Sequence, residues 1–195
     1  MKEQIRYLRR AEKDDALALA QLINLAGEGL PLHIWSGMAE EGESVWDVGC
    51  RRARREDGSF SYRNATIAMS GREIAAALVG YPIGAEPAGI GRDTPPLFVP
   101  LIELENEALC TWYVNVLATY DRFQRRGFGT ALMQEAERQA RAAGLRRMSI
   151  IVTDGNERAA RLYRTLGFCE IEHRPIVKDG WDIDAEHYCL MIKNI

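Results

Sequence analysis

The sequence lacks the features of metal proteins, disulfide-rich proteins and membrane proteins. Its four cysteines lie far apart without a Cys-x-x-Cys pair, and its three histidines have no metal-ligand spacing. We therefore expect buried free thiols and no metal ion. No apolar run approaches the length of a membrane span, and the first residues contain no apolar signal segment. These absences predict a cytoplasmic protein with no membrane partner.

The charge and size of the chain narrow its class further. A net charge of −3 is close to balance, so the composition does not indicate a nucleic-acid partner. With 195 residues, 47% of them hydrophobic, the chain is long enough for one well-buried core. We expect a single domain over residues 1–195. The proline-rich stretch 82–100 is expected to be a long loop rather than a linker between domains, and it lies within an insertion at about 82–107.

Hydrophobic periodicity and turn residues predict strands that alternate with helices. A first strand is expected at 5–8, a helix from about 16 to Ala26, polar helical structure over 32–56 and a hairpin with its turn near Ser70-Gly71. The second half predicts a strand at 109–118, a helix at 130–143, a strand at 148–152, a helix after Asn156 and two strands at 168–172 and 188–192. The pattern is that of an α/β (α+β) fold.

The most informative stretch is the basic turn that precedes the 130–143 helix. Its residues are Gln124, Arg125, Arg126, Gly127, Phe128, Gly129 and Thr130. A helix start offers unpaired backbone N–H groups, and glycines permit a positive φ and close approach of an anion. The third glycine of a dinucleotide-binding fingerprint and the Gly-Lys-Ser/Thr ending of a P-loop are both missing. The turn therefore predicts a pyrophosphate site of another kind.

A second pattern follows one strand later along the chain. Asn156, Ala159, Leu162, Tyr163 and Gly167 have the spacing of a capped amphipathic helix that ends at a glycine. That interpretation leaves the role of Tyr163 open, because a tyrosine at the edge of an apolar stripe also serves as ordinary core packing. The distance from the basic turn fits one helix, one strand and one turn, which would bring two helix starts to the same sheet edge.

These two patterns together resemble the GNAT superfamily of acetyl-CoA-dependent N-acetyltransferases. Gln124 to Gly129 matches the family's Gln/Arg-x-x-Gly-x-Gly/Ala signature, and 156–168 looks like its later helix. The resemblance implies a mixed, V-splayed sheet flanked by helices, with acetyl-CoA as co-substrate. It implies that the backbone of Val116, Leu117 and Ala118 pairs with the pantetheine arm. The turn from Gln124 to Thr130 would hold the pyrophosphate, and Asn156 would lie at the cofactor site.

The resemblance also implies a mechanism in which the acetyl group moves directly to a primary amine. Tyr163 would protonate the leaving thiolate, since a phenol is protonated at neutral pH. Glu105 and Glu107 are candidate bases, although a solvated acidic approach to the 109–118 strand explains them equally well. Asn115 would position the acceptor or a water, or simply satisfy a bulge. The alternative to an enzyme is a CoA-binding sensor without turnover.

The acceptor is the part that the resemblance leaves open. Acidic residues at Glu103, Glu105 and Glu107 and in the 179–186 loop favour a cationic amine. The inserted stretch at about 82–107 could cover the acceptor pocket or form the contact of a homodimer.

Overall fold

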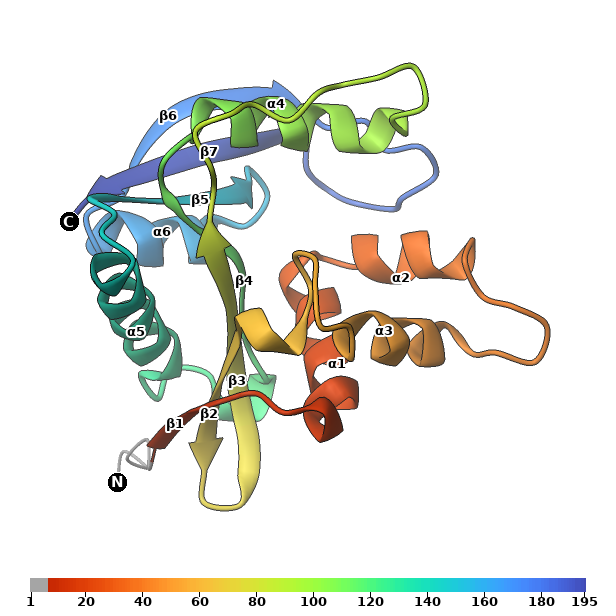
Figure 1. The fold of residues 1–195 in the computed structure, drawn as a ribbon, viewed down its shortest axis with the longest axis horizontal. Coiled ribbons are helices and arrows are strands. Elements are labelled where there is room, and N and C mark those ends of the chain that lie inside the picture. Colours follow the sequence, from red (N-terminus) through yellow and green to blue (C-terminus); the bar gives the residue numbers. More distant parts are fainter. Residues whose placement is uncertain (1–6) are drawn as a thin grey trace. The chain divides into compact units, whose positions relative to one another are not determined.

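The computed structural model describes residues 7–195, which form a seven-stranded mixed sheet and six α-helices (Figure 1). The strands are β1 (Tyr7–Arg10), β2 (Ala65–Ser70), β3 (Glu73–Pro82), β4 (Trp112–Thr119), β5 (Arg147–Thr153), β6 (Cys169–Pro175) and β7 (His187–Asn194). The helices are α1 (Ala16–Ala26), α2 (Leu30–Ser36), α3 (Val45–Ala53), α4 (Val99–Glu107), α5 (Phe128–Ala142) and α6 (Glu157–Thr165). The mixed α/β class expected from the sequence is confirmed.

The chain falls into two compact units. The first extends to Gly80 and includes Asn115–Ala136, and the second comprises Tyr81–Val114 and Glu137–Ile195. The strands β3 and β4 and the helix α5 each contribute residues to both units.

The strands of the first unit follow the order β1-β2-β3-β4. β1 pairs with β2 and β2 with β3, both antiparallel, and Gly71 takes a φ of 65° in the turn between β2 and β3. The predicted hairpin is therefore confirmed. The strand expected at 5–8 is β1, although Ile5 lies outside the described residues.

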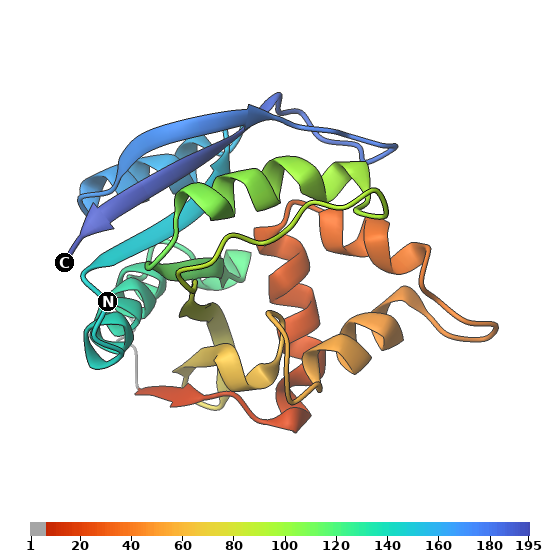
Figure 2. The same cartoon turned by 45° about the horizontal axis from the view of Figure 1, so that its top comes forward.

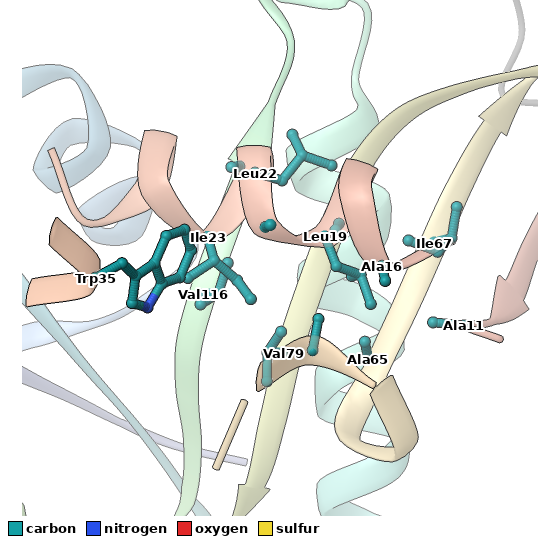
Figure 3. Packing of buried hydrophobic residues seen from close by; sticks show 14 of the residues in the cluster. Ala11, Ala16, Leu19, Leu22, Ile23, Trp35, Ala65, Ile67, Val79 and Val116 are labelled. Carbon is teal, nitrogen blue, oxygen red and sulfur yellow. The ribbon is translucent and has the colours of Figure 1, made fainter. Parts of the chain in front are cut away.

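The core of the first unit lies between the sheet and three helices, with α2 and α3 beside α1 (Figure 1). Leu19 and Ile23 of α1 gather with Ile67, Val79 and Val116 of the strands in Figure 3. The helix expected from about 16 to Ala26 is confirmed as α1, and its buried face consists of Ala16, Leu19, Ala20, Leu22 and Ile23.

The polar helical structure expected over 32–56 is divided into α2 and α3. Ser44 begins α3 with a capping box, in which its side chain accepts from the Asp47 N–H at 3.2 Å and the Asp47 carboxylate accepts from the Ser44 N–H at 3.0 Å. Trp35 of α2 and Trp46 of α3 meet edge to face with ring centroids 6.4 Å apart, so the two helices pack through their tryptophans.

The strands of the second unit follow the order β4-β5-β7-β6. β4 runs parallel to β5 with Trp112 opposite Met148, whereas β7 is antiparallel to both β5 and β6. The helix α4 packs against β6 and β7 (Figure 2), and α6 packs against β5.

The inserted stretch contains a helix where the sequence suggested only a loop. α4 begins at Val99 with Pro100 in its first turn. Backbone N–H groups of the first turn have no helical acceptor, so the missing N–H of proline costs no hydrogen bond there. Leu104 and Ala108 are fully buried. The strand expected at 109–118 begins only at Trp112, because Cys110 takes a left-handed turn with a φ of 57°.

The expectation that the thiols are buried is wrong, since Cys50 and Cys189 are only partly buried and the other two are exposed. All four cysteines are free, but Cys110 lies exposed in the turn before β4, and Cys169 is exposed at the start of β6. β6 ends the strand order of its unit, so its side chains are less covered than those of β5 and β7. None of the helices in residues 7–195 is long and apolar enough to span a bilayer.

Candidate active site

The basic turn lies in the first unit, between a short 3₁₀ helix (Asp121–Phe123) and α5. Arg125 and Gly127 take positive φ angles of 59° and 87°. The Ala131 N–H donates to the Gly127 carbonyl at 3.0 Å, which closes the first turn of α5. The positive φ expected at Gly127 is thus confirmed.

Gly129 corrects the expected helix boundary. α5 begins at Phe128, two residues before the expected Thr130, so Gly129 is helical and does not take a left-handed φ. The N–H groups of Phe128, Gly129 and Thr130 belong to the first turn of the helix, whose N–H groups lack intrahelical acceptors. A missing side chain at Gly129 still allows an anion to approach this turn closely.

Aromatic packing, cation–π contacts and a side-chain hydrogen bond hold the turn in shape. The rings of Phe123 and Phe128 are buried and meet edge to face at 5.9 Å. The guanidinium groups of Arg122 and Arg126 lie 4.9 Å and 5.6 Å from the centre of the Phe123 ring. Gln124 donates its side-chain amide to Asp121 at 2.8 Å. The side chain of Gln124 therefore shapes the turn, and backbone N–H groups are the donors suited to a phosphate.

Successive residues of β4 point to opposite faces of the strand, and these include the residues expected to bind pantetheine. Val116 and Ala118 are buried in the core of the first unit (Val116 in Figure 3), whereas Asn115 and Leu117 are partly exposed. Because two of the three expected cofactor residues point into the core, any ligand contact at Val116 and Ala118 is left to backbone groups.

The second unit places Asn156 where the sequence expected it. Its side-chain oxygen accepts the Ala159 N–H at 3.1 Å and caps α6. Gly167 stops the same helix with a φ of 90°. Both local signals of the second sequence pattern are confirmed as structural features.

Asp154 and Gly155 join the turn before α6 to the loop at 176–186. The Asp154 carboxylate accepts the Glu186 N–H and faces the His187 Nδ1, both at 3.0 Å. Partial burial raises the pKa of Asp154, but these hydrogen bonds outweigh it and leave that pKa below its usual range. A Cβ at Gly155 would lie 2.6 Å from the Asp184 carbonyl oxygen. Sequence reasoning missed this junction, because its partners lie about thirty residues apart.

Tyr163 is 5% exposed in the middle of α6. Its ring centre lies 6.1 Å from that of Phe168 at a tilt of 58°. The ring is therefore part of the packing beneath α6, as one of the two interpretations of the sequence expected. Packing of the ring is compatible with a chemical role for the hydroxyl.

The three glutamates of α4 have different surroundings. Glu103 pairs with Arg174 of β6 at 3.0 Å, and Glu107 is exposed. Glu105 is largely buried and accepts a hydrogen bond from the Tyr113 hydroxyl. Burial raises the pKa of Glu105 above its usual range, and the Tyr113 hydrogen bond opposes that rise only in part.

Tyr113 is the residue of this region that sequence reasoning missed. It is 5% exposed, and its ring meets that of Tyr81 edge to face at 5.7 Å. Burial raises the pKa of Tyr113 well above its usual value, and the nearby Glu105 carboxylate adds to the effect. A tyrosine in an apolar strand gives no distinctive sequence signal, since its partner comes from a helix that was not predicted.

Comparison with known proteins identifies the family. The model of the acetyltransferase (GNAT) family matches residues 40–168, which is more than half of the chain. No curated protein matched the sequence.

Solved structures share the fold. They include an acetyltransferase crystal structure at TM-score 0.66 and 21% identity, covering 97% of this chain and 99% of that one. An N-acetyltransferase from Staphylococcus aureus Mu50 has a TM-score of 0.63 at 16% identity over 95% and 99% of the two chains. A GNAT family acetyltransferase from Elizabethkingia anophelis, with acetyl-CoA bound, has a TM-score of 0.50 at 17% identity over 67% and 75%. With its left-handed Gly127 turn at the start of α5 and its family match over 40–168, this chain belongs to the GNAT family of acetyltransferases.

Proposed function

We propose that this protein transfers the acetyl group of acetyl-CoA to a primary amine, with a cationic amine as the favoured acceptor. The observation that carries the proposal is the basic turn, in which a left-handed Gly127 leads into the N-terminus of α5 beside Arg125 and Arg126. This arrangement suits a pyrophosphate, and acetyl-CoA carries one. The Elizabethkingia anophelis acetyltransferase, similar in fold, has acetyl-CoA bound.

The cofactor would be held mainly by backbone groups. Val116, Leu117 and Ala118 would pair with the pantetheine amides in the manner of an added strand, in the splay expected between β4 and β5. The pyrophosphate would lie against the turn from Gln124 to Thr130, and Asn156 would border the arm.

The reaction would form one bond and break one bond. The amine nitrogen attacks the thioester carbonyl carbon, and the bond between that carbon and sulfur then breaks. A proton must leave the amine, and a proton must reach the thiolate. In the proposal Glu105 takes the first proton, directly or through water, and Tyr163 supplies the second. A backbone N–H near Leu117 would donate to the oxyanion, and Asn115 would orient the acceptor.

Among the glutamates, Glu105 is a better candidate for the base than Glu107. A base acts best when its pKa is close to the working pH, and burial moves the pKa of Glu105 in that direction. Glu107 is exposed at the end of α4.

The proposal is tested by thiol release from acetyl-CoA with a panel of polyamines, amino acids, aminoglycosides and peptides. We expect turnover with at least one cationic amine. Tyr163→Phe keeps the ring that packs on Phe168, so it should retain CoA binding and lose about 10²–10⁴ in rate. Tyr7→Phe, at a tyrosine that is half exposed in β1, is the matched control and should leave the rate unchanged.

A separate substitution tests the proposed pyrophosphate site. Gly129→Arg should abolish CoA binding in calorimetry, because its side chain would fill the space next to the first turn of α5. Gly89→Arg, in the open inserted loop, should bind CoA normally. CoA binding without turnover on any amine would indicate a sensor, and normal affinity in Gly129→Arg would refute the pyrophosphate site.

A further inference from the structure

Tyr113 is a buried titratable residue that the proposed mechanism does not use, although it touches the proposed base. Its hydroxyl donates to the Glu105 carboxylate across the interface between β4 and α4, within the second unit. We propose that Tyr113 is a positioning residue of the acyl transfer, whose hydroxyl holds the Glu105 carboxylate in its working orientation. This inference rests on the proposed function, in which Glu105 is the base.

The strand side of this pair is held rigidly. The Thr111 hydroxyl lies 2.6 Å from the Ser149 hydroxyl and donates to the Ala108 carbonyl at 2.7 Å, and both threonine and serine are fully buried. Tyr113 itself pairs in register with Ser149. With the Tyr81 ring packed edge to face against it, the phenol of Tyr113 has little freedom to turn away from α4.

The helix side is anchored on each flank of Glu105. Leu104 is fully buried, and Glu103 pairs with Arg174 at 3.0 Å. Asn106 donates to the Ala88 carbonyl at 3.0 Å and accepts the Ala88 N–H at 2.7 Å, which ties α4 to the inserted loop. These contacts limit the rotation of α4, and they keep the partly buried Glu105 side chain directed toward β4.

The chemistry of the pair suits a base with an orienting partner. A carboxylate has two oxygens and several lone pairs, so one hydrogen bond from Tyr113 leaves room for an amine or a water. Tyr113 remains a donor throughout the working range, because burial and Glu105 both raise its pKa. Donation to the charged form favours that form, so the hydroxyl counteracts the burial of Glu105.

The charged group that β6 places near α4 is paired with carboxylates other than Glu105. From β6, Arg174 pairs with Glu103 and Glu172. From β7, Tyr188 faces Tyr113, as does Tyr81 from β3, and the short helix at 96–98 has no titratable side chain. The Tyr113 hydroxyl is the hydrogen-bond donor that β4 offers to the Glu105 carboxylate.

The experiment is the pH profile of kcat/KM for Tyr113→Phe with acetyl-CoA and the best amine of the panel. Loss of the hydroxyl should raise the pKa of Glu105, so the acidic limb should move up by about one pH unit. Tyr81→Phe keeps its ring and leaves the Glu105 hydrogen bond in place, so its limb should stay where the wild-type limb is. A Tyr113→Phe profile with an unmoved limb would overturn the inference, because a purely structural role changes the rate at every pH alike.

Two further measurements keep the test decisive. If Tyr113→Phe folds poorly, 3,5-difluorotyrosine at position 113 preserves the shape and provides a more acidic donor. That substitution should move the limb to lower pH, and an unmoved limb would count against the inference. Glu105→Gln distinguishes a failure of the proposed base from a failure of the proposed role of Tyr113. Full activity in that variant removes Glu105 as the base, whereas an inactive Glu105→Gln with an unmoved Tyr113→Phe limb refutes only the role of Tyr113.

Discussion

Gly49 in the middle of α3 is the place where one added methyl group should have the clearest effect on stability. A Cβ at this position would lie 2.6 Å and 2.9 Å from two carbons of the Trp35 ring, and 2.9 Å from the Ala20 Cβ. Alanine ordinarily favours a helix interior over glycine by about 1 kcal/mol. Overpacking a tight core costs about 1–3 kcal/mol, so the clash should outweigh the helical gain.

We expect Gly49→Ala to lower the free energy of unfolding by up to about 2 kcal/mol, which corresponds to a fall in Tm of up to about 8 °C. Urea unfolding followed by circular dichroism measures the difference. Gly37→Ala is the matched control. Gly37 has a φ of −80°, and the nearest atom to an added Cβ is 3.7 Å away, so alanine should stabilise the protein by about 0.4–1 kcal/mol.

The contact with Trp35 can be isolated by a second change. Trp35→Leu removes the ring carbons that meet the added methyl group, although by itself it leaves a cavity. The double variant should be less destabilised than the sum of the single variants. A Gly49→Ala protein as stable as the wild type, or additive losses in the double variant, would refute the assignment of this contact.

Three further substitutions test the structure elsewhere. Arg9 donates two 2.7 Å hydrogen bonds to Asp15; burial raises the pKa of Asp15, but Arg9 and a backbone N–H lower it below its usual range. The stability that Asp15 contributes is therefore present above about pH 4 and is lost as the pH falls through its folded-state pKa. Asp15→Asn should lower the free energy of unfolding by about 2 kcal/mol at pH 7, measured in urea, and by progressively less in acid. Thr111→Val should lower the free energy of unfolding by about 1–3 kcal/mol, because it breaks the buried hydrogen bond to Ser149. Ser149→Ala should cost less in the Thr111→Val variant than in the wild-type protein, because that bond is already lost. Gly155→Ala should destabilise the protein in thermal unfolding, because its methyl group would meet a backbone carbonyl oxygen at 2.6 Å.

Each of these has an outcome that contradicts it. An Asp15→Asn difference that is constant from pH 7 to pH 2 would mean that the ion pair does not supply the stability. If the stability losses of Thr111→Val and Ser149→Ala simply add in the double variant, the two hydroxyls do not stabilise each other. An unchanged Tm in Gly155→Ala would show that the 176–186 loop yields easily.

Local signals in the sequence correctly predicted much of the fold. Asn156 caps α6, and Gly144 ends α5 with a φ of 74° while the Leu145 N–H donates to the Ala140 carbonyl at 3.0 Å. Gly127 takes the left-handed conformation that the basic turn requires. Such signals are reliable because the interacting groups lie within a few residues of one another, so the chain order itself brings them together.

The segment before β4 could not be predicted in the same way. Its prolines suggested a loop, and α4 has only a narrow buried face around Leu104 and Ala108. Packing against β6 and β7 stabilises this helix, and those strands come more than sixty residues later. Tertiary burial therefore overrode a weak local preference.

By itself, the sequence determined the family and the donor end of the reaction. The turn from Gln124 to Thr130 is a local backbone motif, and the phosphate site proposed there rests on two glycines and a helix start. The tertiary structure alone decided which acidic side chain is the candidate base of the proposed mechanism. Three glutamates alternate along α4 in the sequence, but only folding sets Glu105 against Tyr113, pairs Glu103 with Arg174 and leaves Glu107 in solvent. The pKa of a carboxyl group depends on desolvation and on nearby donors, and in this protein both come from residues distant in the chain.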